Sequence, residues 1–157
     1  MGVATGEHIN NSVMFKQLLQ AEALDVVQLD ACRLNSIDEI LSVLLLSAKF
    51  GVPIVPHCGG AGMVELCSHI STIDFVSVSG KESILEYTDH LHEAFVAPVG
   101  ITADGYHVTP QVPGYSCDVK EAEFEKFESP NGSFWQSDKG KSMLADPWRG
   151  LPGEQTS

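Results

Sequence analysis

The chain has 157 residues, which fits one domain but falls short of the roughly 250 residues of a complete TIM-type barrel. Its 9 basic and 21 acidic side chains give a formal net charge of −12. This balance disfavours nucleic acid and anionic membrane surfaces as partners, because both attract basic patches. No run of 18 apolar residues occurs, so the sequence predicts no membrane-spanning helix.

The cysteines and the first residues bear on the compartment. The start, MGVATGEHINN, lacks the basic region and apolar core of a secretory signal. We therefore predict a cytoplasmic protein, or a mitochondrial one if the true N-terminus precedes Met1. Free thiols fit such a reducing compartment better than a disulfide framework, and zinc at Cys58 beside His57 is the less favoured alternative. The cysteines are scattered without regular spacing: Cys32, Cys58, Cys67 and Cys117.

A strand and an amphipathic helix are predicted at the start of the chain. Residues 3–5 are short and mostly apolar, and look like the end of a strand entered midway. Asn10 or Asn11 is the expected cap of the helix that follows. Its apolar side chains recur at helical spacing: Met14, Phe15, Leu18 and Leu19.

Two more strands with a helix between them are predicted next. Residues 26–29 and 52–55 are short apolar runs typical of buried strands. Ser36 and Glu39 form an S-x-x-E capping box at the start of the intervening helix, and Gly51 ends it.

The pattern continues more weakly after the third strand. Residues 63–70 are predicted to be helical, residues 74–79 alternate in part and predict a fourth strand, and residues 84–95 predict a helix. The remaining expectations are one or two extended segments in 96–108, a short charged stretch in 120–128 and an irregular polar tail from 138 onward.

A polar residue closes each predicted strand. Glu7, Asp30, His57 and Ser79 lie 23, 27 and 22 residues apart, the spacing of a repeating strand–loop–helix unit. In a parallel barrel such residues gather at the carboxyl ends of the strands, where catalytic residues lie. The fold class predicted is α/β, an incomplete TIM-type barrel.

Each candidate residue has a functional and an ordinary interpretation. Asp30 and His57 on neighbouring strand ends would form a proton-transfer dyad, although Asp30 beside Arg33 also suits a local ion pair and a lone histidine is more often structural. Glu7 is either a surface carboxylate or an oxygen ligand for Mg²⁺. Glu86 either stabilises the first turn of a helix or faces the pocket as an acid that donates to an oxyanion.

The ordered motifs resemble the L-fuconate dehydratase branch of the enolase superfamily, the mandelate racemase and muconate lactonizing enzyme type. The resemblance covers roughly residues 3–136. It rests on Thr5-Gly6-Glu7-His8, Phe15-Lys16-Gln17-Leu18-Leu19-Gln20, Gln28-Leu29-Asp30-Ala31-Cys32-Arg33, Pro56-His57-Cys58-Gly59-Gly60 with Glu65-Leu66, Tyr87-Thr88-Asp89-His90-Leu91-His92, Pro113-Gly114-Tyr115-Ser116, and Pro130-Asn131-Gly132 with Trp135.

The resemblance implies a role for each matched site residue. Glu7 would be the last of three carboxylate ligands for Mg²⁺, and Asp30 with His57 would form the acid/base dyad. His57 would protonate the departing β-hydroxyl of a sugar acid after its α-proton is removed, and Glu86 would hydrogen-bond the enediolate. The segment between Gly80 and Glu86 is shorter than the family pattern.

The same resemblance implies that much of such an enzyme lies outside this sequence. Residues 1–136 would be about strands 5 to 8 of a (β/α)7β barrel, and residues 137–157 a polar tail. The capping domain, the Lys-x-Lys base and two metal ligands would be missing, so a second copy or a complementing N-terminal half is an expected partner beside the sugar acid. The alternative is a catalytically inactive relic or interaction fragment.

Overall fold

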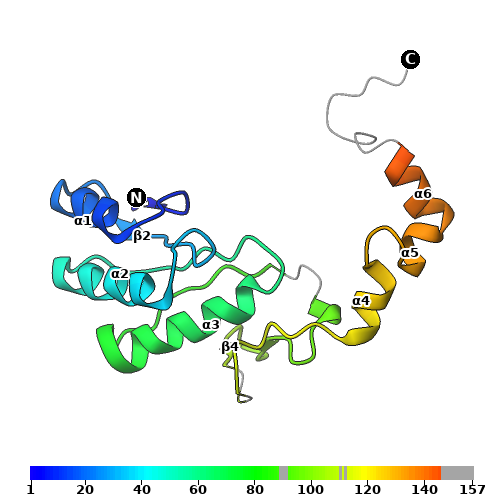
Figure 1. Cartoon of the computed structure of the whole chain (residues 1–157). Coiled ribbons are helices and arrows are strands. Elements are labelled where there is room, and N and C mark those ends of the chain that lie inside the picture. Colours follow the sequence, from blue (N-terminus) through cyan, green and yellow to red (C-terminus); the bar gives the residue numbers. More distant parts are fainter. Residues whose placement is uncertain (89–91, 110, 112, 146–157) are drawn as a thin grey trace. The chain divides into compact units, whose positions relative to one another are not determined.

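The computed structural model describes residues 1–88, 92–109, 111 and 113–145. The chain divides into two compact units, Met1–Asp118 and Val119–Ser157, each with its own internal packing (Figure 1). Among the described residues, no helix is both long enough and apolar enough to cross a membrane. All of the predicted site residues belong to the first unit.

Three parallel segments form the small sheet of the first unit. Strand β1 (Ala4–Thr5) pairs with β2 (Val26–Val27). Val27 also forms a parallel bridge with Ile54, so the predicted third strand is present as an extended segment with one bridge. The ladder continues toward the site, because the backbone N–H of His57 donates to Leu29 O at 2.8 Å. The three predicted strands are therefore neighbours in the order of the chain.

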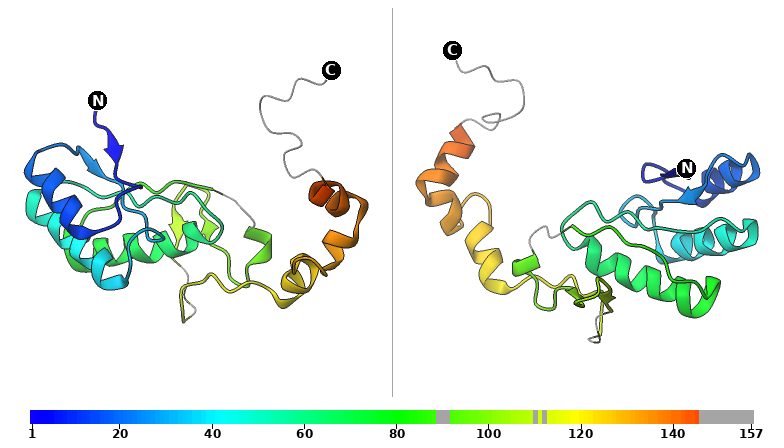
Figure 2. Two further views of the ribbon diagram at one scale, coloured as in Figure 1. Left: turned by 45° about the horizontal axis from the view of Figure 1, so that its top comes forward. Right: turned by 180° about the vertical axis from the view of Figure 1, so that it is seen from behind.

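Helices α1 (Ser12–Gln20) and α2 (Ile37–Phe50) pack against each other and cover this sheet (Figures 1 and 2). Asn11 caps α1 as predicted, and its side chain accepts a hydrogen bond from Met14 N at 2.9 Å. Gly51 ends α2 with a φ of 70°, which a residue without a Cβ adopts without strain. Between helices and sheet lies one apolar core of fully buried side chains: Phe15, Val27, Leu29, Val43 and Leu44.

The predicted capping box of α2 is only half formed. Ser36 caps the helix by accepting a hydrogen bond from Glu39 N at 3.3 Å. The Glu39 carboxylate does not return to Ser36 but accepts from Ser12 N at 2.6 Å and from Ser12 Oγ at 3.0 Å. A carboxylate at the start of α2 therefore ties down the start of α1, where it also complements the positive end of the helix dipole.

The expected fourth strand is wrong. Helix α3 (Met63–Ile73) runs directly into η1 (Asp74–Ser79), a π-helical turn that ends at Gly80 with a φ of 65°. The helical form is favoured because buried Asp74 accepts a hydrogen bond from Ser79 Oγ at 2.6 Å. A short, partly alternating run does not by itself distinguish a strand from a helical segment.

The expected helix over residues 84–95 is also wrong. Residues 81–88 have no regular secondary structure, residues 89–91 lie outside the described part, and only η2 (His92–Ala94) is a 3₁₀ turn. The extended segments expected in 96–108 are confirmed as β3 (Gly100–Ile101) and β4 (His107–Val108), an antiparallel pair. Glu86 thus sits in an irregular segment instead of a first helical turn.

The second unit is a run of short helices, α4 (Glu121–Phe127), α5 (Ser133–Gln136) and α6 (Asp138–Ala145). The Trp135 indole N–H donates to Phe127 O at 2.8 Å, and the Phe127 and Phe134 rings lie 5.0 Å apart. The irregular tail expected from residue 138 is therefore helical as far as Ala145, and residues 146–157 lie outside the described part.

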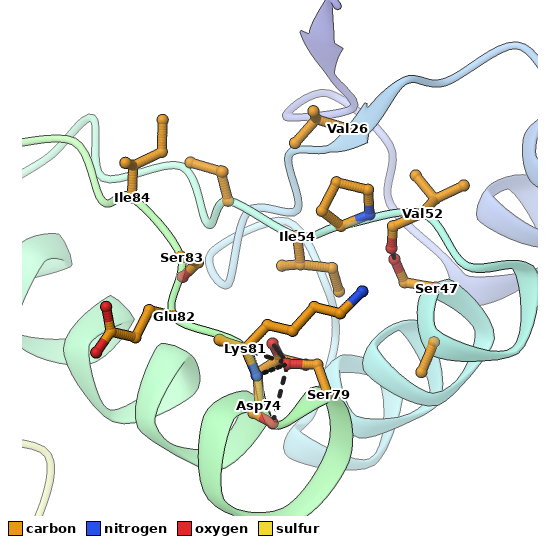
Figure 3. A pocket seen from close by; sticks show the side chains of 13 residues that line it. Val26, Ser47, Val52, Ile54, Asp74, Ser79, Lys81, Glu82, Ser83 and Ile84 are labelled. Carbon is orange, nitrogen blue, oxygen red and sulfur yellow. Dashed lines mark hydrogen bonds between the residues drawn. The ribbon is translucent and has the colours of Figure 1, made fainter.

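A cavity of about 340 Å³ lies between the third parallel segment and residues 81–84 (Figure 3). Apolar side chains such as Val26, Val52 and Ile54 form its walls, and Lys81 extends into it. None of the predicted site residues lines this cavity. The polar cluster that unites those residues lies elsewhere in the first unit.

Candidate functional site

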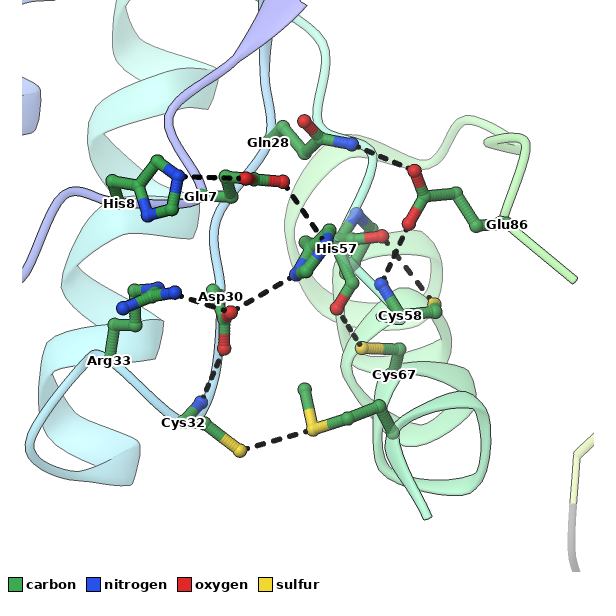
Figure 4. A network of polar contacts seen from close by, with 12 residues as sticks. Glu7, His8, Gln28, Asp30, Cys32, Arg33, His57, Cys58, Cys67 and Glu86 are labelled. Carbon is green, nitrogen blue, oxygen red and sulfur yellow. Dashed lines mark hydrogen bonds and ion pairs between the residues drawn. The ribbon is translucent and has the colours of Figure 1, made fainter. Parts of the chain in front are cut away.

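The centre of the polar cluster is a contact between Asp30 and His57 (Figure 4). His57 Nδ1 lies 3.0 Å from Asp30 Oδ2, and the Asp30 residue is only 5% exposed. The other Asp30 oxygen, Oδ1, accepts from Cys32 N at 2.7 Å. Arg33 Nε lies 3.6 Å from Oδ2. Asp30 is therefore fixed from two sides, and it sets the orientation of the imidazole.

Glu7 occupies the other side of the same imidazole. Glu7 Oε2 lies 3.1 Å from His57 Nε2, while Oε1 lies 3.0 Å from Nε2 of the exposed His8. Three of the four predicted strand-end residues, Glu7, Asp30 and His57, are thus in direct contact, whereas Ser79 ends the helical turn η1 and lines the separate cavity. His57 stands between two carboxylates, one at each ring nitrogen, an arrangement that orients the ring for proton transfer.

Two glycines make room for this contact. A Cβ at Gly59 would lie 2.5 Å from His57 Nε2 and 2.6 Å from Cε1, so a side chain there would displace the ring. Gly6 has a φ of 127°, and a Cβ there would lie 2.9 Å from Phe15 Cε1. The backbone therefore brings Glu7 close to the core in a conformation that other residues rarely adopt.

Glu86 joins the cluster from the irregular segment. Its Oε1 accepts from Gln28 Nε2 at 3.0 Å, and its Oε2 accepts from Cys58 N at 2.8 Å. Thr88 Oγ1 adds a hydrogen bond to Cys58 O at 2.7 Å. Both Glu86 oxygens thus hold protein groups, and the predicted contact of Glu86 with an enediolate stays a prediction.

Sequence reasoning did not single out Gln28 or Gly59. Gln28 was visible as the polar residue inside the otherwise apolar run Val26-Val27-Gln28-Leu29, where an exposed strand position or a functional contact is expected. Gly59 had no such signal, because Gly59-Gly60 is also typical of an ordinary loop. Only the position of the His57 ring shows what Gly59 is for.

Two buried thiols lie beneath the dyad. Cys58 and Cys67 are both fully buried, and Cys67 Sγ donates to His57 O at 3.2 Å. The hydrogen bond with Cys58, followed by burial, raises the pKa of the Cys67 thiol well above its ordinary value. This thiol therefore stays protonated at neutral pH and acts as a packing residue, whereas Cys32 is exposed.

The donor set does not fit a resident Mg²⁺ ion by itself. Mg²⁺ prefers octahedral oxygen sites made from carboxylates, substrate and water. Within the described residues there is no group of three or more His, Cys, Asp or Glu that could hold a metal ion. Glu7 is the one predicted ligand here, and both of its oxygens contact histidines.

Comparison with known proteins places the chain in a family. Residues 1–123 match the model of the enolase C-terminal domain-like family. The chain belongs to this family. It is 50% identical over 147 residues to an L-galactonate dehydratase of Hypocrea jecorina, and this alignment covers 92% of this chain and 32% of that protein. It is also 48% identical over 138 residues to mitochondrial enolase superfamily member 1 of Homo sapiens, across 87% of this chain and 31% of that protein.

Solved structures agree on the fold. The crystal structure of human mitochondrial enolase superfamily member 1 superposes with a TM-score of 0.80 at 47% identity, over 86% of this chain and 31% of that chain. An L-talarate/galactarate dehydratase from Salmonella typhimurium LT2, liganded with Mg and L-lyxarohydroxamate, gives a TM-score of 0.63 at 27% identity. That match covers 76% of this chain and 28% of that structure. The predicted fold class is thereby confirmed: the chain is part of an enolase-superfamily barrel and spans about a third of its relatives' length.

Proposed function

We propose that this chain supplies the proton-transfer half of a sugar-acid dehydratase site. The observation that carries the proposal is the row Asp30–His57–Glu7, in which one imidazole contacts a carboxylate at each ring nitrogen, at 3.0 and 3.1 Å. The 50% identity to an L-galactonate dehydratase supports the reaction class. Loss of a hydroxyl as water needs a proton donor, and a histidine with a natural pKa near 6.5 suits that role at neutral pH.

The geometry gives each residue a part in that step. Asp30 holds Nδ1, so His57 Nε2 is the atom that exchanges a proton with the substrate. The substrate loses its α-proton to a base that this chain does not supply. The carbon–oxygen bond at the β-position then breaks, and the proton from Nε2 converts the departing hydroxyl to water. Asp30 stabilises the imidazolium before that transfer, as a buried carboxylate does for a catalytic histidine.

Glu7 is proposed as one metal ligand of the assembled site. Two of the solved dehydratases with this fold were crystallised with Mg. Because Glu7 alone does not fit Mg²⁺, the other oxygen ligands would come from residues outside this chain. The dissociation constant of the isolated chain for Mg²⁺ should then lie far above the cellular Mg²⁺ concentration. Glu7 would also give up its contact with His57 Nε2 when the metal site assembles.

The substrate proposed is L-fuconate or its close analogue L-galactonate. L-Fuconate is 6-deoxy-L-galactonate, so the two acids share the configuration of carbons 2 to 5 and differ only in the hydroxyl on carbon 6. The sequence motifs favour L-fuconate, whereas the curated relative at 50% identity is named for L-galactonate. A contact to the terminal carbon would distinguish the two acids, so a comparison of activity on both substrates decides between them.

A chimeric enzyme tests the proposed function. The matched third of the Hypocrea jecorina L-galactonate dehydratase would be replaced by this chain. We expect the chimera to convert L-fuconate or L-galactonate to a 2-keto-3-deoxy acid in the presence of Mg²⁺, while the isolated chain does not. His57→Asn should lower kcat by about 10²–10⁴, the usual contribution of a general acid.

Controls separate loss of chemistry from loss of folding. Lys16→Ala, on the exposed face of α1, provides a matched surface substitution that should leave the chimera active. A folded chimera that dehydrates neither acid, with the parent enzyme active beside it, would favour the alternative that this chain is a non-catalytic interaction fragment. Equal activity of the His57→Asn chimera would remove the dyad from the mechanism.

A further inference from the structure

A second cluster of buried polar groups surrounds Glu65 of α3 and includes His92 of η2 and His107 of β4. Glu65 is fully buried, and its Oε1 accepts from Val99 N at 3.3 Å. His92 Nε2 approaches the same oxygen at 3.4 Å without hydrogen-bond alignment. Glu65 Oε2, His92 Nε2 and His107 Nδ1 are all buried and have no hydrogen-bond partner. Buried polar atoms without partners are costly, so this cluster needs an explanation.

The cluster fastens one segment of the first unit, residues 92–109, which we call the arm. Val99 is 6% exposed and packs with Cys58, Met63 and Cys67 beneath the dyad. At the far end of the arm, Thr109 Oγ1 lies 2.9 Å from Thr72 Oγ1 of α3. Much of the arm between these contacts is exposed. The arm is therefore held by Val99, the Glu65 cluster and the threonine pair, together with the buried side chains of Ala94 and Phe95 and a hydrogen bond from Val96 N to Asp118 O at 2.8 Å.

Several titratable groups surround Glu65. His92 lies in η2 and His107 in β4, and the Tyr87 ring makes an edge contact with each imidazole, at 5.8 and 6.0 Å between centroids. Cys117 is close enough for the Glu65 charge, after burial, to raise its pKa, and Asp118 adds to that effect. One turn along α3 from Glu65, His69 Nε2 lies 3.2 Å from Ser116 Oγ. Of the two histidines, His92 contacts the Glu65 carboxylate, and His107 is close enough for the Glu65 charge to raise its pKa.

We propose that Glu65, His92 and His107 form a proton-sensitive latch, which holds the arm on α3 at neutral pH and releases it in acid. His92 contacts the Glu65 carboxylate, and its charge opposes a proton on the neighbouring His107. A proton taken up by His107 in acid therefore meets an unfavourable charge in a site with little water, where like charges repel strongly. A metal ion is the less suitable occupant, because the described residues include no three ligands arranged around a common point.

The pKa of His107 gives the direction of the effect. Burial lowers that pKa below the ordinary value of 6.5, the charge of His92 lowers it further, and Glu65 raises it by less. The docked arm therefore binds this proton less tightly than the released arm does. The stabilisation from docking is complete above pH 6.5 and declines as the pH falls below that value. One extra proton bound on release shifts the opening equilibrium by at most about tenfold per pH unit.

Hydrogen–deuterium exchange on the full chain tests the latch. Peptides from the arm would be followed from about pH 7.5 to about pH 5, in the range where histidine titrates, with EDTA present and exchange corrected for its intrinsic pH dependence. We expect the corrected opening of the arm to rise by about tenfold across this range, with peptides of α2 unchanged. His107→Asn should remove the acid response, and His8→Asn, at an exposed histidine, should retain it.

Two results would overturn the latch. One is an arm whose corrected exchange is independent of pH, or responds to acid equally in the His107→Asn chain. The other is suppression of the acid response by added Zn²⁺ in the absence of EDTA, which would make the cluster a metal site. Because Glu65→Gln keeps an acceptor for Val99 N but removes the charge, it should alter the pH response while the arm stays docked at neutral pH.

Discussion

Glu86 Oε2 accepts a hydrogen bond from the backbone N–H of Cys58 at 2.8 Å, and so a residue of an irregular segment fixes the peptide that follows His57. The same carboxylate holds Gln28 through its other oxygen. These contacts tie the ends of two parallel segments together beside the dyad. In this structure Glu86 positions the loop that carries His57.

Removing this carboxylate should loosen the loop. Glu86→Ala leaves Cys58 N and Gln28 Nε2 without their acceptor, and an unsatisfied buried donor costs about 1–3 kcal/mol. We expect a lower free energy of unfolding and faster hydrogen exchange of the Cys58 amide. Glu82→Ala, at an exposed carboxylate in the same segment, is the matched control. Equal exchange in both variants would show that Glu86 does not hold the loop.

The tie between α1 and α2 predicts a second stability effect. Glu39→Ala removes the acceptor of Ser12 N and Ser12 Oγ, and hydrogen bonds to a charged group contribute about 1.5–3 kcal/mol. We expect a loss in that range by urea denaturation. Asp38→Ala, an exposed acid in the same helical turn, should cost only about 0.3–1 kcal/mol through the helix dipole. If Glu39→Ala lowers the free energy of unfolding no more than Asp38→Ala does, the hydrogen bonds between Glu39 and Ser12 do not stabilise the fold.

The sequence predicted those features of the structure that neighbouring residues determine. The caps at Asn11, Ser36 and Gly51 are set by neighbouring residues and were predictable. So was the meeting of Glu7, Asp30 and His57, because parallel strand ends share one edge of a sheet. The form of residues 74–88 was not predictable, because it depends on what these residues pack against.

Residues 74–79 show why the prediction failed in that region. Their alternation suits a strand, but a strand needs a paired neighbour, whereas the Asp74–Ser79 hydrogen bond closes a helical turn locally. The segment that follows then takes its position from Glu86 and Thr88, which bond to both backbone groups of Cys58. Such long-range contacts leave no periodic trace in the sequence.

Gly59 should be intolerant of any side chain. Gly59→Ala would place a Cβ against His57 Nε2 and Cε1, so the ring must move away from Asp30 or Glu7. We expect the nitrogen chemical shifts of the His57 imidazole to change and the chimera to lose most of its activity. Gly2→Ala, whose Cβ would meet its nearest neighbour at an ordinary 3.5 Å, should change neither. If the nitrogen chemical shifts of His57 are unchanged in Gly59→Ala, the loop accommodates the Cβ without moving the imidazole, and Gly59 is not required there.

The buried thiols predict a loss of stability at high pH. The folded pKa of Cys67 is raised above its ordinary value of 9.0, so the folded chain binds this proton more tightly than the unfolded chain. Its stabilisation is complete below pH 9.0 and declines as the pH rises above that value. Cys67→Ala should flatten the alkaline decline in thermal stability, although Cys117, whose pKa burial also raises, contributes in the same direction. Cys32→Ala, at an exposed thiol, is the control.

The outer edge of β1 predicts self-association. Val3 O accepts a hydrogen bond from Val26 N of β2, and Thr5 O accepts one from Gln28 N just beyond β2, so the N–H and C=O of Ala4 between them face away from that partner. Val3 and Ala4 are exposed, and an open strand edge pairs readily with another strand. We expect concentration-dependent dimers or larger species in sedimentation velocity. Ala4→Lys places a charge on this edge and should shift the chain toward the monomer, because edge lysines oppose strand pairing. Lys substitution at exposed Glu22, beyond the end of α1, should leave the association unchanged, and an equal shift in both variants would assign the effect to net charge alone.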